Sequence, residues 1–133
     1  MLGRFLKRKG STGPKDIGKI GEEEASKFLG KKGCKVIERN LRNRFGEIDL
    51  IAKDGKTVVF VEVKTRTNLS FGLPKDAVDF KKKRHMIAAS LDYLSKNPHL
   101  MECPARFDCI GVEFLEGGKF RIEHIENAFE VEE

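Results

Sequence analysis

The sequence has few of the residues that build disulfide frameworks or zinc sites. Only three of its 133 residues are cysteine, and no two of them form a C-x-x-C pair. An odd cysteine count without that spacing fits neither kind of site, and the three histidines are scattered. We therefore expect reduced thiols. These residues are Cys34, Cys103, Cys109, His85, His99 and His124.

Long apolar segments are also missing. No apolar run approaches the roughly 18 residues of a membrane span, and the basic stretch MLGRFLKRKG lacks the apolar part of a signal peptide. There is no internal repeat or low-complexity tract, and the length suits one compact domain. We expect a soluble, cytoplasmic protein with a flexible basic arm over residues 1–16 and one domain over residues 17–133.

Charge is unevenly distributed along the chain. Lys and Arg number 26 against 21 Asp and Glu, yet residues 113–133 hold seven Glu and only two bases. The preceding residues therefore form a basic body, which favours a polyanionic partner such as nucleic acid. A merely solvated basic surface, or an acidic C-terminus that meets another protein, are the alternatives.

Periodicity predicts an α/β domain whose elements follow the order helix, three strands, helix, two strands. The first helix is predicted over 17–32, with Gly33 ending it. The second begins at Asp76 or Asp79 and ends near Lys96, after a loop over 68–74. The predicted strands are 34–40, 45–52, 57–63, 106–114 and 119–125.

Asp54-Gly55 lies between two predicted strands, which is a strong signal for a β-hairpin. If these two residues form the loop, the pairing of the strands can be read backwards from the turn. The predicted pairs are Lys53 with Lys56, Asp49 with Phe60, and Glu47 with Glu62.

In this hairpin three charged side chains share one face of the sheet. Opposite residues, and residues two apart, point to the same side, so Asp49, Glu62 and Lys64 lie together with Glu47 beside them. Asp49 and Glu62 are then diagonal neighbours, roughly 7–8 Å apart at the backbone. Glu62 stands in the apolar run VVFVEV, where an unpaired charge is costly to bury.

A divalent cation would explain two adjacent carboxylates in such a strand. Mg²⁺ or Mn²⁺ prefers oxygen ligands and needs only one or two carboxylates from the protein. Lys64 could orient or deprotonate an attacking water, or stabilise developing negative charge. The alternative is a plain ion pair between Glu62 and Lys64 on a solvated face.

The first helix offers a third carboxylate in GEEEA, residues 21–25. Helical angles place Glu22 at the edge of the apolar stripe and Glu24 near its middle, so either could face the sheet. Glutamates in a first turn also stabilise a helix through its dipole, which is the alternative reading.

Several motifs in order resemble those of the bacterial YraN-like family. They are GEEEA (21–25), ERNLRNRFGEIDLI (38–51), FVEVKTR (60–66), FG (71–72), RFD (106–108) and NAF (127–129). That family is uncharacterised in function and is similar to the restriction-endonuclease-like, PD-(D/E)XK nuclease superfamily. The resemblance implies a restriction-endonuclease-like core, a mixed central sheet flanked by helices, in the order αβββαββ.

The resemblance also implies roles for the acidic residues. Asp49, Glu62 and Glu22 look like metal ligands. Glu22 is chosen over Glu24 because the family's helical glutamate stands three residues before the alanine. Lys64 looks like the catalytic lysine of the E-x-K motif. Ile48 stands where the superfamily's name has proline. We expect these three carboxylates and one ammonium group to converge on a common point.

These expectations point to a Mg²⁺- or Mn²⁺-dependent endonuclease acting on DNA. The layout is similar to that of archaeal Holliday-junction resolvases, which favours branched or structured DNA and a homodimer. The alternative is a non-catalytic DNA-binding module on a nuclease scaffold that acts in DNA repair or processing.

Basic residues near these motifs are candidates for phosphate contacts. The run 81–84 is basic throughout, but its side chains spread around a helix, so only one or two can face a DNA strand. The sequence shows no aromatic ladder for stacking bases, which favours recognition of shape or backbone. The candidates are Arg39, Arg42, Arg44, Arg66, Lys81 and Arg84.

Overall fold

The computed structural model describes residues 14–67 and 79–130, with side chains from Ile17 onward. Its elements confirm the predicted order αβββαββ and add two short helical turns. They are α2 (Pro14–Lys31), β1 (Lys35–Asn43), β2 (Gly46–Asp54), β3 (Thr57–Arg66), α3 (Phe80–Ser95), α4 (Pro98–Met101), β4 (Ala105–Phe114), the 3₁₀ turn η2 (Glu116–Gly118) and β5 (Phe120–Phe129).

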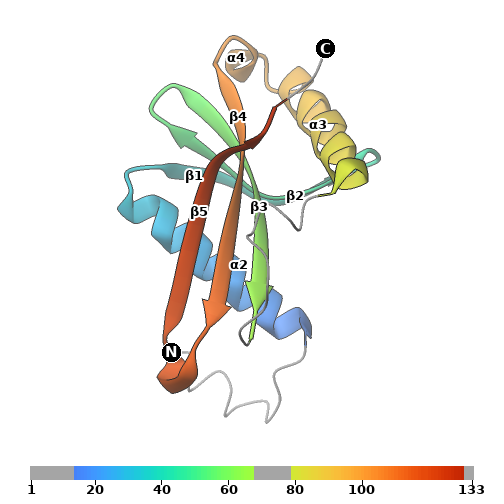
Figure 1. The fold of residues 1–133 in the computed structure, drawn as a ribbon. Helices are drawn as coiled ribbons and strands as arrows, with labels where there is room; N and C mark the ends of the chain where they lie inside the picture. Colours follow the sequence, from blue (N-terminus) through green and yellow to red (C-terminus); the bar gives the residue numbers. More distant parts are fainter. Residues whose placement is uncertain (1–13, 68–78, 131–133) are drawn as a thin grey trace.

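The five strands form one mixed sheet in the order β1-β2-β3-β4-β5, and this confirms the predicted fold class. Neighbouring strands are antiparallel except β3 and β4, which are parallel. A parallel pair needs a long crossover, and α3 with α4 provides it here. Figure 1 shows α2 and α3 flanking the central strands.

The sheet has an apolar core on each face. Ala25 and Leu29 of α2 pack with one face of the sheet, and Met86 and Ala89 of α3 pack with the other. Residues 58–62 of β3 are all buried, because that strand lies between the two cores. This burial on both faces explains why the strand reads as a nearly continuous apolar run.

Local signals set the helix ends. α2 stops where Gly33 takes a φ of 94°, which favours glycine, as predicted. α3 begins after Asp79, whose carboxylate accepts a hydrogen bond from the backbone N–H of Lys82 at 2.8 Å. Asp76, the other predicted cap, lies outside the described residues. So do the predicted loop 68–74 and most of the predicted arm 1–16.

The predicted pairing of the hairpin was wrong by two residues. Asp54 pairs with Thr57, so the loop residues are Gly55 and Lys56 rather than Asp54 and Gly55. Gly55 has a φ of 62° and takes the first loop position, where a glycine-first turn requires it. Because the shift is even, every side chain keeps its predicted face.

The shift changes which residues face one another across the hairpin. Phe60 lies opposite Ile51 rather than Asp49, and Glu47 pairs with Arg42 of β1 rather than facing Glu62. Continued in the same register, Asp49 falls opposite Glu62. The two carboxylates are therefore brought closer together than the diagonal placement predicted.

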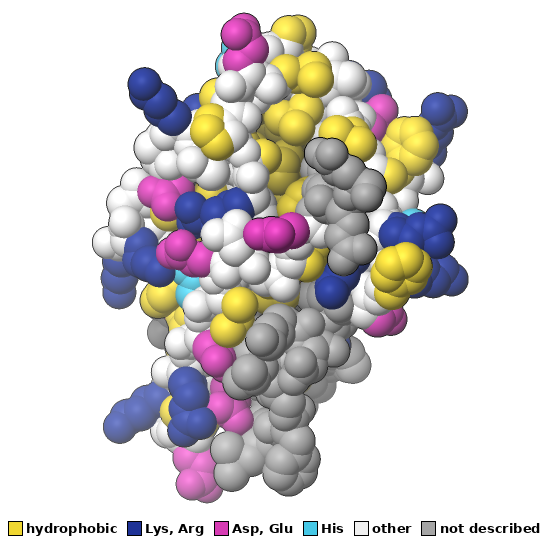
Figure 2. Space-filling model, turned by 45° about the horizontal axis from the view of Figure 1, so that its top comes forward, with side chains coloured by type: hydrophobic (Ala, Val, Ile, Leu, Met, Phe, Trp, Pro, Cys, Tyr) yellow, Lys and Arg dark blue, Asp and Glu magenta, His cyan; other side chains and the backbone are white. Residues whose placement is uncertain are grey.

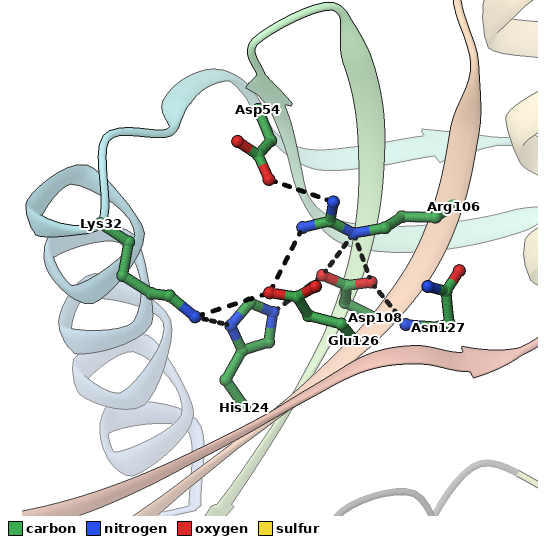
Figure 3. Close-up of polar contacts among 7 residues, drawn as sticks. All are labelled: Lys32, Asp54, Arg106, Asp108, His124, Glu126 and Asn127. Carbon is green, nitrogen blue, oxygen red and sulfur yellow. Dashed lines mark hydrogen bonds and ion pairs between the residues drawn. The ribbon is translucent and has the colours of Figure 1, made fainter.

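A buried polar network joins the end of α2 to the sheet (Figure 3). Its centre is Asp108 of β4, which is fully buried and accepts from Arg106 Nε at 3.0 Å. His124 Nε2 lies 2.8 Å from Asp108, and the backbone N–H of Asn127 donates to it at 3.1 Å. The register of β4 and β5 shifts between Phe107 and Cys109, so Asp108 stabilises an irregular stretch of pairing.

None of the helices in the described residues combines the length and apolarity needed to cross a membrane.

Candidate metal centre

β2 and β3 separate beside the acidic residues. Their pairing runs from Asp54 and Thr57 to Leu50 and Val61, although β3 continues along β4 as far as Arg66. Just beyond that point, Asp49 Oδ2 accepts a hydrogen bond from the backbone N–H of Val63 at 2.8 Å. A side chain thus replaces the missing strand partner, and the carboxylate of Asp49 is held at the opening.

Asp49 and Glu62 form an acid pair at this opening. Their carboxyl groups lie within hydrogen-bond reach of each other, and Glu62 is buried. Burial, and then the charge of Asp49, raises the pKa of Glu62 to about 7. Burial likewise raises the pKa of Asp49. Full ionisation of such a pair is unfavourable unless a positive charge lies beside it.

Lys82 of α3 supplies one positive charge to the acid pair. Its Nζ lies 2.5 Å from Glu62 Oε2, and its side chain is about half exposed, at 47%. Burial acts to lower the pKa of Lys82, but the contact with Glu62 outweighs it and raises that pKa. No local signal in the sequence distinguishes Lys82 from its basic neighbours. Only helical phase relative to the sheet could have distinguished it.

Glu22 approaches the acid pair from α2. Burial, followed by the charge of Asp49, raises the pKa of Glu22, while a hydrogen bond from the side chain of Asn40 acts to lower it. Glu24 instead pairs with Lys27 of its own helix at 3.5 Å. The structure thus resolves the choice that helical angles left open, since Glu22 is the glutamate that faces the acid pair.

A close approach between helix and strand places Glu22 there. A Cβ on Gly21 would lie 2.0 Å from Thr65 Oγ1, so only glycine lets α2 cross β3 at this point. Gly21 is buried, and Glu22 follows it directly. The glycine of the GEEEA motif therefore sets the distance between α2 and the acid pair.

The acid pair lies between two depressions. One, which we call the α2-side cleft, has a volume of about 550 Å³ and is lined by Glu22, Asp49, Glu62 and Lys64. The other, which we call the α3-side hollow, has a volume of about 330 Å³ and shares Asp49, Glu62 and Lys82 with the cleft. The four residues proposed for catalysis thus line one cleft.

The residues present fit a divalent cation only in part. Within the described ranges, no three acidic, histidine or cysteine side chains lie close enough together to hold an ion as they stand. Two adjacent carboxylates nevertheless suit Mg²⁺ or Mn²⁺, which keep several water ligands. The ammonium group of Lys82 already occupies a cation's place against Glu62. The expected convergence is therefore tight for Asp49 and Glu62 and looser for Glu22.

The candidate phosphate contacts fall into three groups. Arg66 lines the α2-side cleft and Lys81 lines the α3-side hollow. Arg39 is held by Glu23 at 2.7 Å and by Ser26, and Arg42 pairs with Glu47 at 3.0 Å. Two arginines lie over aromatic rings, namely Arg44 over Phe45 and Arg84 over Phe80.

The five-stranded mixed sheet with flanking helices defines a restriction-endonuclease-like core, with an acid pair where its strands diverge. Residues 21–112 match the uncharacterised protein family UPF0102. The chain belongs to this family, the YraN family, as the sequence motifs predicted.

Relatives bearing the family's name resemble the chain over most of its length. A UPF0102 protein of Geobacter metallireducens is 49% identical over 117 residues, which cover 88% of this chain and 94% of that protein. A UPF0102 protein of Trichlorobacter lovleyi is 45% identical over 120 residues, covering 90% of this chain and 94% of the relative. Among solved structures, SfsA of Pyrococcus furiosus in complex with Ca²⁺ is 13% identical with a TM-score of 0.43, covering 86% of this chain and 65% of that one.

Proposed function

We propose that the protein is a Mg²⁺- or Mn²⁺-dependent endonuclease that hydrolyses phosphodiester bonds in branched or otherwise structured DNA. The observation that carries the proposal is the acid pair of Asp49 and Glu62, which lies in a cleft that Glu22 and Lys64 also line. A fold alone does not define an activity, so the proposal depends on this arrangement of side chains.

The four residues have two kinds of role, namely three carboxylates that would hold a cation and one lysine that would act on water or phosphate. Asp49 and Glu62 would hold the cation, with Glu22 closing on it from α2 as the third ligand. The cation would supply Lewis-acid chemistry when bound, making water more acidic and taking up charge on phosphoryl oxygens. Lys64 is exposed in the cleft and makes no ion pair with any described residue. Its ammonium group would position the attacking water or stabilise charge on the phosphate.

The basic residues around the two depressions support a nucleic-acid substrate. Residues 81–84 at the start of α3 are all basic, and the first turn of that helix has no acidic residue. Positive charge at a helix N-terminus opposes the helix dipole, so these bases do not stabilise the helix. The negative charges of a bound phosphate backbone would neutralise these positive charges. A homodimer would present two clefts to a branched substrate.

Cleavage of defined DNA substrates tests this proposal. Wild type, Asp49→Asn and Lys64→Ala are incubated with linear duplex, single-stranded, circular and four-way-junction DNA in Mg²⁺ or Mn²⁺. Glu38→Gln and Lys56→Ala, exposed residues that line neither depression, are the matched controls. We expect cleavage by wild type and both controls, and a loss of about 100-fold or more in each site variant.

The same assay examines the non-catalytic alternative. If wild type and all variants bind DNA equally and none cleaves any substrate, the protein is a binding module and the proposed activity is wrong. Cleavage that persists unchanged in Asp49→Asn would place the activity elsewhere or in a contaminant.

A further inference from the structure

Two exposed phenylalanines carry arginines over their rings. Phe80, the first residue of α3, is 72% exposed, and the Arg84 Cζ atom lies 5.6 Å from the centroid of its ring. Phe45, in the turn between β1 and β2, is 36% exposed, and the Arg44 Cζ atom lies 4.8 Å from its ring centroid. Neither ring belongs to the apolar cores.

Both pairs lie at the rim of the α3-side hollow. Gly46, which follows Phe45, approaches α3 so closely that a Cβ on it would lie 3.1 Å from the Cβ of His85. Gly46 and His85 line the hollow, as do the neighbours of Phe80 in sequence. Figure 1 shows the turn between β1 and β2 beside the N-terminal end of α3.

The α3-side hollow is lined both by basic residues and by the acid pair. Asp49, Glu62, Lys81 and Lys82 all line the hollow. Figure 2 shows lysine and arginine side chains on the right-hand margin of the molecule, on the side where α3 lies, as well as on the opposite margin. The rim therefore combines aromatic faces, guanidinium groups and proximity to the proposed cleavage site.

This combination suits an unpaired base. Exposed aromatic rings stack on free bases, each base being worth about 1–3 kcal/mol by alanine substitution, and arginine adds a cation–π contribution. In a fully paired duplex each base is already stacked on its neighbours and offers no free face. Against such a duplex the Phe80 and Phe45 rings would have nothing to stack on.

We propose that the Phe80–Arg84 and Phe45–Arg44 pairs form a stacking site for unpaired bases, so that the preferred substrate is DNA with an unpaired segment beside the phosphodiester bond. This inference rests on the proposed function for its substrate, but not on hydrolysis. It goes beyond the expectation from sequence, which favours recognition of shape or backbone, because the two rings are 35 positions apart in the chain and stand beside residues of the same hollow only in the fold.

Binding in EDTA, where no cleavage occurs, tests the stacking site. Fluorescence anisotropy compares a fully paired duplex with the same duplex carrying a bulge of unpaired adenines, one of them replaced by 2-aminopurine. The variants are Phe80→Ala and Phe80→Tyr. Leu91→Ala, which removes another exposed apolar side chain from α3 at 58% exposure, is the control.

We expect wild type to bind the bulged duplex more tightly and to quench the 2-aminopurine. Phe80→Ala should weaken binding of the bulged duplex about tenfold and leave the paired duplex within about twofold. Phe80→Tyr, which keeps the ring, and Leu91→Ala should both behave as wild type.

Three results would overturn the inference. They are equal wild-type affinity for the two duplexes, equal weakening of both by Phe80→Ala, and a change of oligomeric state in Phe80→Ala with DNA binding intact, which would assign the ring to a subunit contact. Because no metal is present, loss of the stacking site and loss of the proposed hydrolysis are separate outcomes. A bulge preference without cleavage would leave a binding module.

Discussion

Two sets of acidic side chains, Asp108 alone and Asp49 with Glu62, lie on the same sheet and differ in how their negative charge is compensated. Asp108 receives hydrogen bonds from His124, Arg106 and the backbone of Asn127. Burial acts to raise its pKa, but these bonds outweigh burial and hold the pKa of Asp108 below its usual value. The acid pair of Asp49 and Glu62 has raised pKa values instead.

In the Asp108 network every partner of the buried carboxylate is defined, although Arg106 Nη2 is buried without a hydrogen bond to the described residues and lies 4.0 Å from Glu126 Oε2. Lys32 Nζ lies 2.9 Å from His124 Nδ1, and an ammonium group can only donate. His124 Nδ1 must therefore accept, so that Nε2 carries the proton it donates to Asp108. Arg106 also pairs with Asp54 at 3.1 Å (Figure 3). A buried carboxylate that receives three donors is typical of a structural network.

The acid pair is different because its partners are too few. Among the described residues, the two carboxyl groups share one half-exposed ammonium group and one backbone N–H, and they border two depressions open to solvent. Burial of an acid therefore does not by itself indicate function. The combination of raised pKa values and adjacent space distinguishes a site that can accept a cation from a network in which the carboxylate is already paired.

The largest effect on the free energy of unfolding is expected in the Asp108 network. Asp108→Asn leaves Arg106 without its buried charged partner, and we expect a loss of about 3–5 kcal/mol in the free energy of unfolding. Because the pKa of Asp108 is lowered in the folded state, this loss is full above the unfolded value of 3.8 and shrinks as the pH falls below it. Urea denaturation at neutral pH measures it.

Asp54→Asn is the control for that substitution. Asp54 contacts the same arginine but is 45% exposed, so its loss should cost less than about 1 kcal/mol. Equal destabilisation by the two variants would show that Asp108 is not the centre of the network.

Gly21→Ala should disturb the other region through packing. The added Cβ meets Thr65, and we expect a loss of about 1–3 kcal/mol in stability. Thr65→Ala in the same chain should restore part of it. Gly18→Ala, on the same helix with open space around it, should instead stabilise by about 0.5–1 kcal/mol. Thermal and urea unfolding of the three variants check this, and a Gly21→Ala protein as stable as wild type would contradict the close approach.

Removing a charge from the acid pair should have the opposite sign to its removal from the network. The pKa of Glu62 is about 7 when folded and 4.5 when unfolded, so the folded protein binds more protons between these values and loses stability as pH rises through them. Glu62→Gln abolishes this loss. In EDTA its stability relative to wild type should rise by roughly 1–3 kcal/mol from pH 4.5 to pH 8. A pH-independent difference would argue against the raised pKa.

The smallest effect concerns the cation that the chain itself provides. Lys82→Met removes the ammonium group that competes with a metal for Glu62, so Mn²⁺ should bind roughly threefold more tightly. Lys83→Met, which removes a neighbouring lysine that lies over the Phe129 ring, should leave Mn²⁺ affinity unchanged. Weaker binding in Lys82→Met would show that the lysine supports the metal rather than competing with it.

Local signals in the sequence predicted the order of elements and the faces of the acidic residues. Alternation along β3 placed Glu62 and Lys64 on one face, and Asp49 of β2 stayed on that face because the error in register was even. The register depended on whether Asp54 or Gly55 opened the turn, which short motifs do not decide. Local patterns do distinguish helix from strand and one face from the other.

Contacts between distant segments were beyond such patterns. The ion pair of Lys82 with Glu62 joins α3 to β3, and the choice of Glu22 depends on where Gly21 meets Thr65. Both follow from how helices lie on the sheet, which no local periodicity specifies. The partners of Asp108 were missed for the same reason.

The most direct test of the central claim is calorimetric titration of Mn²⁺ at pH 7.5 into wild type, Asp49→Asn, Glu62→Gln and the control Glu38→Gln. If the acid pair is a metal centre, wild type and Glu38→Gln bind Mn²⁺ with the same affinity, and both acid-pair variants lose about tenfold or more. Binding of equal strength in all four proteins would contradict the account, because the ion would then be held somewhere other than between β2 and β3.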